Sequence, residues 1–246
     1  MAARRGFGGQ TLGKVDPKTG KHTEYPVPEL KKGSPVGALS LRNDRDGNLW
    51  LGMMYQAGVA KFDRKTEKFQ TWPIPAELNS ANTQVNMTSP MNIGVDGKVW
   101  AQNNGFAGVH RIDLKSGKWE NWEPYKAAPQ GHNIYDVVSD SQNNGWFTNI
   151  GREHIGRIDA KTKDVKFFSV PGLKARRGRI DFKDDKFYFG EYLADKISVF
   201  DIKTGKTVWT DRQRSPLTSG TLATAGGVVF QGALDRWFTA YDDATD

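Results

Sequence analysis

The chain has 246 residues, a formal net charge of +7 and no cysteine. The absence of cysteine excludes disulfides, thiolate chemistry and cysteine-ligated zinc. Hydrophobic residues make up only 37% of the sequence but aromatic residues reach 11%, which favours a core of few, large side chains over a disordered chain. No apolar run approaches the ~18 residues of a membrane-spanning helix, so no membrane partner is expected.

The positive charge is distributed along the chain. Many lysines lie in or beside short turns that recur throughout the sequence, for example Lys18, Lys65 and Lys203. Lysines at such places keep edge strands from pairing with other chains, so we interpret them as solvated surface and expect no nucleic-acid partner. The opening MAARRGFGGQ has two arginines but no apolar segment, so it does not read as a signal peptide.

One turn motif recurs from the first residues of the chain to the last. It reads VDPKTGKHTEYPVP at 15–28, which is a strand end, a Lys-Thr-Gly turn and a second strand closed by prolines, and it returns as FDRKTEKFQTWPIP at 62–75. The opening aspartates are 41 to 50 residues apart with strand-like sequence between them, which is typical of propeller blades. These aspartates are Asp16, Asp63, Asp113, Asp159, Asp201 and Asp242.

Each period contains further short strands between the turns. In the period that ends at Pro171, the segments IYDVVSD, NGWFTNI, HIGRIDA and DVKFFSV predict an inner, a second, a third and an outer antiparallel strand. The second strands are aromatic, and several outer strands close on proline, which an unpaired edge tolerates. No segment shows helical periodicity over about 11 residues. The remaining second strands are expected within 47–54, 97–104, 185–192 and 226–233.

These periods predict an all-β fold, a β-propeller of four-stranded antiparallel blades that forms one domain over residues 1–246. The expected strands number 21, with two in the first blade and three in the last. The ring is then either five blades with a surplus strand or six blades incompletely closed, and an unclosed edge predicts an oligomer. The predicted partial first blade is 1–30, the full blades are 31–75, 76–125, 126–172 and 173–213, and the partial last blade is 214–246.

Four phrases within residues 10–200, namely DPKTGKHTEYPVP, DGNLWLG, NGWFTNIGREHIGRID and FYFGEYLADKISVFD, resemble the virginiamycin B lyase (streptogramin lyase) family of propellers. The resemblance implies a magnesium-dependent carbon–oxygen lyase with a histidine in Pro-His phrases and glutamates after the second strands. This sequence has no Pro-His phrase. His132 lies three residues ahead of the matching position and Glu191 alone keeps the glutamate, so these two are the candidate catalytic residues, with Met53, Asn103 and Asn149 at the glutamate's place in other blades.

The end of the chain differs from the rest. DIKTGKTVW at 201–209 and the segment at 219–246 resemble blades of pyrroloquinoline quinone (PQQ) dehydrogenases, whose docking motif packs a tryptophan, here Trp209, on the neighbouring blade. No adjacent cysteines and no recognisable base and calcium set accompany it, so PQQ is not expected as a cofactor. The chain reads as a join or fragment of two propeller types. Relatives of both are often exported, which implies a periplasmic or secreted location.

Loops that enter the inner strand and leave the second strand of each blade meet on the axial face of a propeller. Amide, aromatic and guanidinium groups there suit a polar or anionic small ligand, and a protein partner is the alternative. Four histidines without ligand spacing predict no metal site; His132 also reads as a turn residue, and His154 as a surface partner of Glu153. The predicted ligand-binding residues are Tyr55, Gln56, Asn103, Asn104, Arg152, Arg176, Arg177, Tyr192 and Arg236.

The sequence therefore favours a binding or scaffold propeller related to streptogramin lyases. Two alternatives stay open. One is a magnesium-dependent lyase whose base has moved to His132. The other is a recombined propeller without a selected function.

Overall fold

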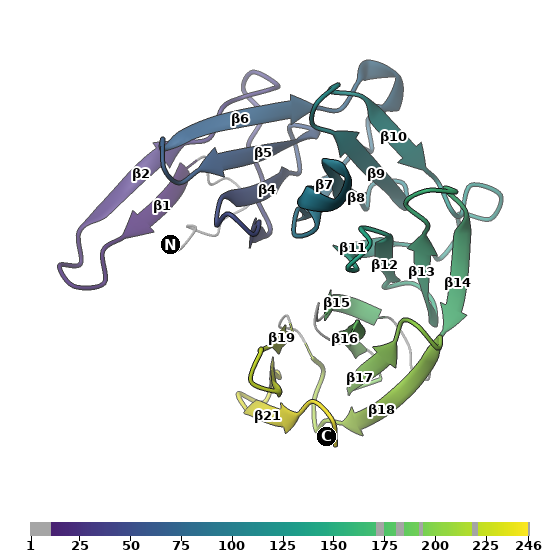
Figure 1. The fold of residues 1–246 in the computed structure, drawn as a ribbon. Coiled ribbons are helices and arrows are strands. Elements are labelled where there is room, and N and C mark those ends of the chain that lie inside the picture. Colours follow the sequence, from purple (N-terminus) through teal and green to yellow (C-terminus); the bar gives the residue numbers. More distant parts are fainter. Residues whose placement is uncertain (1–10, 171–174, 181–184, 192–193, 218–220, 246) are drawn as a thin grey trace. The chain divides into compact units, whose positions relative to one another are not determined.

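The structure is a computed structural model of the chain (Figure 1). It describes residues 11–170, 185–191, 194–217 and 221–245 in full, and the backbone of 175–180. The described strands form six antiparallel sheets: one of two strands, four of four strands and one of three. The predicted all-β fold and its 21 strands are thus confirmed within the described ranges. No described helix has the length and apolar character needed to cross a bilayer.

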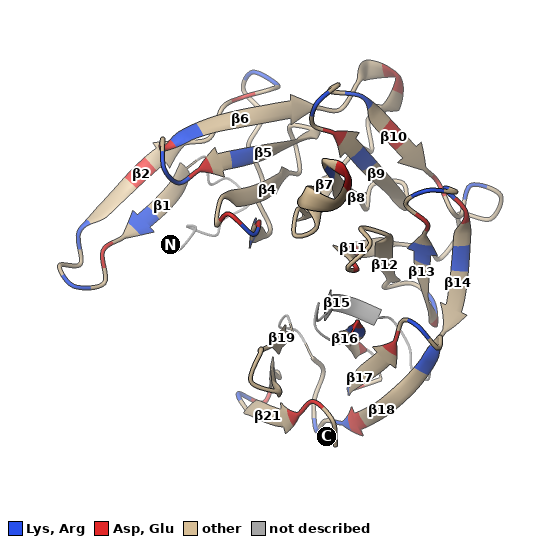
Figure 2. Cartoon of the chain, viewed as in Figure 1, with Lys and Arg blue, Asp and Glu red and all other residues tan. Residues whose placement is uncertain are grey.

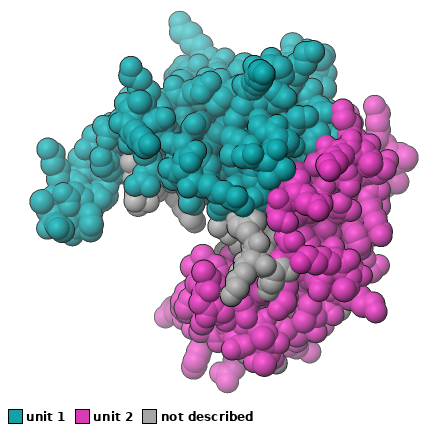
Figure 3. All heavy atoms as spheres, viewed as in Figure 1, with its two compact units in different colours: residues 1–122 teal, residues 123–246 magenta. Residues whose placement is uncertain are grey.

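The chain divides into two compact units, Met1–Trp122 and Glu123–Asp246, which Figure 3 colours separately. Unit 1 contains the two-stranded first sheet, blade 2 and blade 3. Its strands are, for the first sheet, β1 (Thr11–Val15) and β2 (His22–Pro26); for blade 2, β3 (Leu41–Asn43), β4 (Leu49–Met53), β5 (Gly58–Asp63) and β6 (Lys68–Pro73); and for blade 3, β7 (Val85–Ser89), β8 (Lys98–Asn103), β9 (Gly108–Asp113) and β10 (Trp119–Trp122).

Two single-turn helices, η1 (Ala76–Leu78) and α1 (Ile93–Asp96), also lie in unit 1. Unit 2 contains blade 4, blade 5 and the three-stranded last sheet. Its strands are, for blade 4, β11 (Ile134–Ser139), β12 (Gly145–Asn149), β13 (His154–Ile158) and β14 (Val165–Ser169); for blade 5, β15 (Ala175–Ile180), β16 (Lys186–Glu191), β17 (Lys196–Asp201) and β18 (Lys206–Arg212); and for the last sheet, β19 (Leu222–Ala223), β20 (Val228–Gly232) and β21 (Phe238–Asp242).

The recurring turn is built by its aspartate. In all six copies the aspartate Oδ1 accepts the backbone N–H groups two and three residues further on, at 2.8 to 3.4 Å. In the first five copies the residue four positions after the aspartate has a positive φ, for example 71° at Gly205, which favours glycine. Figure 2 shows the acidic and basic residues in the turns after β5, β9 and β17. Because these bonds are local, the turn forms wherever the motif occurs.

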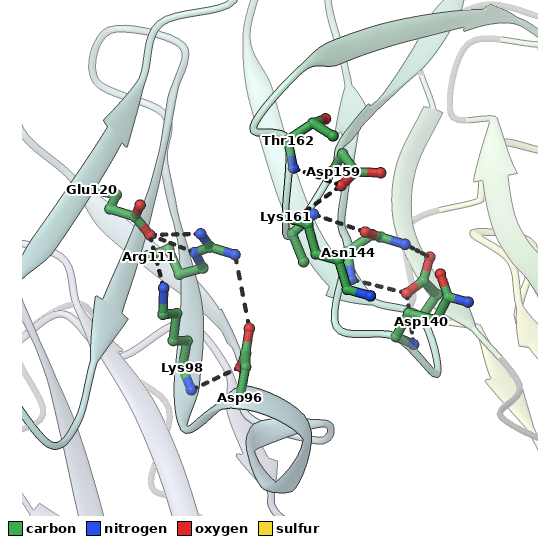
Figure 4. A network of polar contacts seen from close by, with 11 residues as sticks. Asp96, Lys98, Arg111, Glu120, Asp140, Asn144, Asp159, Lys161 and Thr162 are labelled. Atoms are coloured by element: carbon green, nitrogen blue, oxygen red, sulfur yellow. Dashed lines mark hydrogen bonds and ion pairs between the residues drawn. The ribbon is translucent and has the colours of Figure 1, made fainter.

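Blades 2 and 4 share a second polar motif that sequence reasoning missed. Asp140 Oδ2 accepts from the side-chain amide of Asn144 at 2.9 Å (Figure 4). It also accepts from the indole of Trp146 at 2.9 Å. The side-chain oxygen of Asn144 accepts the N–H of Ala160, which ties this turn to the next one. The same bonds join Asp44, Asn48 and Trp50 in blade 2. The motif satisfies a buried indole N–H, which would otherwise destabilise the core.

Neighbouring sheets of one unit pack through large apolar side chains. In unit 2, Trp146 of blade 4 lies edge-on to Phe187 and Phe200 of blade 5, with ring centroids 6.2 and 6.0 Å apart. Strands β4, β7 and β12 are buried at every position, whereas β6 and β18 expose alternate residues. This is the pattern of sheets covered on both faces except at their outer strands, as propeller blades require.

The tryptophan docking implied at the end of the chain is also observed. Trp209 on β18 donates its indole N–H to the carbonyl of Asp243 at 3.3 Å. Its ring lies 5.9 Å from that of Tyr241 on β21, in the next sheet. Trp209 therefore joins blade 5 to the last sheet.

Candidate functional site

The last residue of the second strand occupies an equivalent place in each blade. These residues are Met53, Asn103, Asn149 and Glu191, and none of them is exposed to solvent. The four residues that the sequence placed at equivalent positions of their blades are therefore equivalent in the structure as well. The four side chains differ in chemistry, so each blade uses the same place in a different way.

In blade 4, Asn149 organises the loops around it. Its Oδ1 accepts the backbone N–H groups of Asn133 at 3.1 Å and Gly151 at 2.8 Å. These two bonds fix the orientation of the amide, so Nδ2 points the other way, toward two imidazoles. Nδ2 lies 2.8 Å from Nδ1 of His132 and 3.4 Å from Nε2 of His154.

This arrangement determines the tautomers of both histidines. An amide nitrogen can only donate, so the ring nitrogens that face it must accept and carry no proton. His132 is then protonated at Nε2, and His154 at Nδ1. The hydroxyl of Tyr125 lies 2.7 Å from Nε2 of His154 and donates to its single lone pair, so the amide of Asn149, at 3.4 Å, is the weaker contact there.

Aromatic contacts hold the same residues in place. The ring of Tyr125 stacks on that of His132, with centroids 3.9 Å apart and 11° between the planes. Phe167 on β14 lies 5.5 Å from Tyr125 and 5.2 Å from His154. Five side chains from one loop and three strands thus form one cluster, which we call the blade-4 cluster: Tyr125, His132, Asn149, His154 and Phe167.

Burial and charge keep the cluster neutral. Burial lowers the pKa of His132, and the nearby guanidinium of Arg152 lowers it further. Burial also lowers the pKa of His154. The nearby His132 and Arg152 lower this pKa further, while the carboxylate of Glu153 raises it. Burial raises the pKa of the Tyr125 hydroxyl. At neutral pH both imidazoles and the phenol are therefore uncharged.

The cluster lines a hollow of about 410 Å³. This volume is within the roughly 300–1,000 Å³ of small-molecule pockets. The hollow extends from the loop before β11 to the outer strand β14, so it lies on the outer half of blade 4. Its lining residues are Pro124, Tyr125, Ala127, Ala128, His132, His154, Phe167 and Ser169.

Arg152, a predicted ligand-binding residue, is exposed next to this hollow. Its guanidinium donates to the carbonyl of Gln130 at 3.3 Å and covers Gly131, where an added Cβ would come within 2.8 Å of it. It is thereby held beside His132.

Glu191, the other candidate catalytic residue, is buried in blade 5. Its Oε1 accepts the hydroxyl proton of Ser198, and its Oε2 has no hydrogen-bond partner among the described residues. Burial raises the pKa of this carboxyl group. No contact within the described part of the chain joins Glu191 to His132, so the pairing of these two residues stays a prediction.

The remaining predicted residues occupy varied positions. Tyr55 and Arg236 are exposed. The buried amide of Gln56 bonds to the backbone of Leu30, Lys31 and Ser34. All of its hydrogen-bonding groups are therefore used within the protein, which leaves none for a ligand in this conformation.

Asn103 likewise has an internal role, since it accepts from the backbone of Gln84 and Gly105. Asn104 is half-buried, and its side-chain oxygen has no partner in the described ranges. Tyr192 and the side chains of Arg176 and Arg177 lie outside the described residues.

Sequence reasoning missed two members of the blade-4 cluster, Tyr125 and Phe167. It also interpreted His154 as the surface partner of Glu153, and this is wrong, because His154 is half-buried and bonds to Tyr125 and Asn149. The available signal was the recurrence of an asparagine at the end of the second strand, at 103 and 149, with a histidine within seven residues of each.

The residues do not fit the magnesium site that the family resemblance implies. Among the described residues no three histidine or acidic side chains gather as metal ligands. The oxygen of Asn149 is used by two backbone N–H groups, and Met53 offers no oxygen at all. We therefore derive no step through a bound metal ion.

Comparison with known proteins agrees with the fold. The chain matches no model of a known protein family. A solved structure of virginiamycin B lyase from Staphylococcus aureus aligns with 94% of this chain and 77% of its own, at 20% identity and a TM-score of 0.67. At that identity the similarity shows the fold alone. The chain thus has a β-propeller fold with streptogramin lyases among its structural relatives.

Curated relatives match only part of the chain. The lanthanide-dependent methanol dehydrogenase of Methylacidiphilum fumariolicum is 40% identical over 63 residues, which are 26% of this chain and 9% of that enzyme. A quinoprotein alcohol dehydrogenase of Pseudomonas putida is 30% identical over 99 residues, 35% of this chain and 16% of the enzyme. The matches span less than a fifth of these dehydrogenases. The chain therefore combines a lyase-like propeller fold with a segment related to PQQ dehydrogenase repeats.

Proposed function

We propose that the chain is a propeller module that binds a small molecule without converting it. The observation that carries this proposal is the amide of Asn149. It donates toward the lone-pair nitrogens of both His132 and His154. A general base needs its lone pair directed at the substrate, and here both lone pairs are used inside the protein.

The same contacts favour binding. Stacked rings and a fixed amide hold the wall of the hollow in one conformation, and a preorganised wall lowers the entropy lost when a ligand binds. The proposal also includes the loops at the axial face, where the sequence predicts a polar or anionic ligand or a protein partner. Tyr55 supports that part, because its side chain is exposed.

The test measures turnover and binding on the same sample. The chain is incubated with a streptogramin lactone and magnesium, and linear product is followed by mass spectrometry. In parallel, ligand-observed NMR measures binding of small aromatic probes. We expect binding without product. Magnesium-dependent product that is lost in His132→Phe and kept in His22→Gln would overturn the proposal.

A second candidate is a lyase in which Glu191 takes part. It is favoured by the buried carboxyl group of Glu191, whose raised pKa suits a proton donor. If this candidate is right, Glu191→Gln lowers product formation by about 10²–10⁴-fold. Unchanged product formation in Glu191→Gln would exclude it.

A further inference from the structure

We infer that the hollow of blade 4 binds an aromatic carboxylate, with the ring against the exposed face of Phe167 and the carboxylate toward His132 and Arg152. This inference rests on the proposed binding function and adds the location of the site and the chemical class of the ligand. It follows from three properties of the hollow: its apolar wall with an aromatic ring, its hydrogen-bond donors and its charge.

The apolar wall fits a flat ring. Tyr125 and Phe167 stack with centroids 5.5 Å apart at 29°, and Tyr125 is buried, so the ring face that this wall offers is that of Phe167. Pro124, Ala127 and Ala128 complete the wall with small apolar groups. Phe167 remains 45% exposed, which is unusual for a phenylalanine and leaves its face available. An aromatic ring of the ligand that lies on the face of Phe167 gains both apolar burial and offset stacking.

The polar wall consists mainly of donors. Because Asn149 fixes the tautomers, His132 presents Nε2–H and His154 presents Nδ1–H. Neither nitrogen has a hydrogen-bond partner among the described residues, and neither is completely buried. Both are therefore open to a ligand or to solvent. Tyr125 directs its own proton at His154 and cannot donate elsewhere. A ligand that satisfies this wall must bring acceptor oxygens.

The charge at this end of the hollow is positive. Arg152 is held over Gly131 and acts on the pKa of both imidazoles, whereas Glu153 acts on His154 only. Neutral imidazoles next to a guanidinium form a set of donors with one full positive charge. Carboxylates bind to such a set through charge-assisted hydrogen bonds, which are stronger than neutral ones.

Three probes of similar size separate ring, acceptor and charge: benzoate, benzamide and cyclohexanecarboxylate. Benzamide keeps the ring and loses the charge, and cyclohexanecarboxylate keeps the charge and loses the flat ring. We expect benzoate to bind in the millimolar range that its size allows, and about five- to tenfold more tightly than either of the others. Binding is measured by ligand-observed NMR, and ¹⁵N shifts of the histidine rings report contact at Nε2 of His132.

Variants locate the site. Arg152→Gln is expected to weaken benzoate about fivefold and leave benzamide unchanged, because only the charge is lost. The matched control Arg212→Gln removes an exposed arginine of β18 and leaves both unchanged. His132→Phe keeps a ring against Tyr125 but removes the donor, so both probes weaken. The double variant Arg152→Phe/His154→Gly copies the residues of blade 3 and is expected to abolish all binding.

The outcomes separate the two proposals. If benzamide or cyclohexanecarboxylate binds as well as benzoate, the ligand class is wrong and the binding function stands. If benzoate binds His132→Phe and the double variant as tightly as it binds the unmodified chain, the proposed location of the site is wrong. If no small molecule binds the unmodified chain, the binding function itself fails. Unfolding curves of each variant show whether a loss of binding reflects a loss of fold.

Discussion

Blades 3 and 4 place an asparagine and a histidine in nearly the same frame, with different results. In both, the asparagine at the end of the second strand accepts two backbone N–H groups and directs Nδ2 at an imidazole. In blade 3 that imidazole is His110, 2.9 Å from Asn103 and fully buried. In blade 4 it is a pair, His132 and His154, which lines an open hollow.

The difference comes from three aligned positions. Blade 3 has Phe106, Gly108 and His110, where blade 4 has Arg152, His154 and Gly156. Phe106 folds over Gly108, where an added Cβ would come within 2.4 Å of its ring. In blade 4 the position of Gly108 carries His154, and Arg152, at the position of Phe106, lies over Gly131 instead. One frame is therefore closed by an aromatic side chain and the other is left open.

The rest of blade 3 shows the same closed character. Arg111 is completely buried, with its Nε donating to Glu120 at 2.8 Å and its guanidinium 4.8 Å from the ring of Trp100 (Figure 4). In blade 4 the indole of Trp146, at the position equivalent to Trp100, donates to Asp140. The polar groups of blade 3 are thus closed off inside the blade, whereas those of blade 4 line a hollow.

Replacing the asparagine tests the shared frame with the largest expected effect. Asn103→Leu leaves two backbone N–H groups and His110 without partners, so we expect a loss of about 3–4 kcal/mol in unfolding free energy. Asn149→Leu is expected to cost less, about 2 kcal/mol, because water reaches its surroundings. Chemical denaturation measures both. Equal losses would contradict the distinction between a closed and an open frame.

The pH dependence of stability tests the closed histidine. Burial lowers the pKa of His110 to about 4, from a usual value of about 6.5. Between pH 6.5 and about 4, His110 binds a proton in the unfolded chain but stays neutral in the folded chain. Stability contributed by neutral His110 is therefore full above pH 6.5 and is lost as the pH falls toward 4, by on the order of 2–3 kcal/mol.

The control for this prediction is His110→Gln, which can still accept from Asn103 but does not titrate. Denaturation midpoints are compared at several pH values between 7.5 and 4.5. We expect a steeper decline for the unmodified chain than for the variant. Parallel curves for the two proteins would show that His110 does not carry the effect.

The smallest effect is expected where the two blades are alike. Asp113 and Asp159 open the same turn and accept the same two backbone N–H groups. Asp113→Ala and Asp159→Ala should therefore each lower the denaturation midpoint slightly, and Asp159→Ala a little more, because Asp159 also pairs with Arg157 at 2.8 Å. A large difference between them would mean that the turn is not an equivalent unit in both blades.

Much of the fold was predictable from the sequence. The strands of blade 4 and the equivalence of Asn103 and Asn149 follow from spacing and composition. The hollow was not predictable, because it depends on contacts between Tyr125, the loop at His132 and the outer strand at Phe167. The interpretation of His154 failed for the same reason, since its decisive partner, Tyr125, lies 29 residues away.

The sequence by itself determined the repeating unit, because each aspartate turn is closed by hydrogen bonds within a few residues and each aromatic strand is apolar on its own. Only the tertiary structure decided which repeat is open. The orientation of one amide, fixed by two backbone N–H groups, sets the tautomers of two histidines, one from a loop and one from strand β13. No local pattern of residues encodes that arrangement.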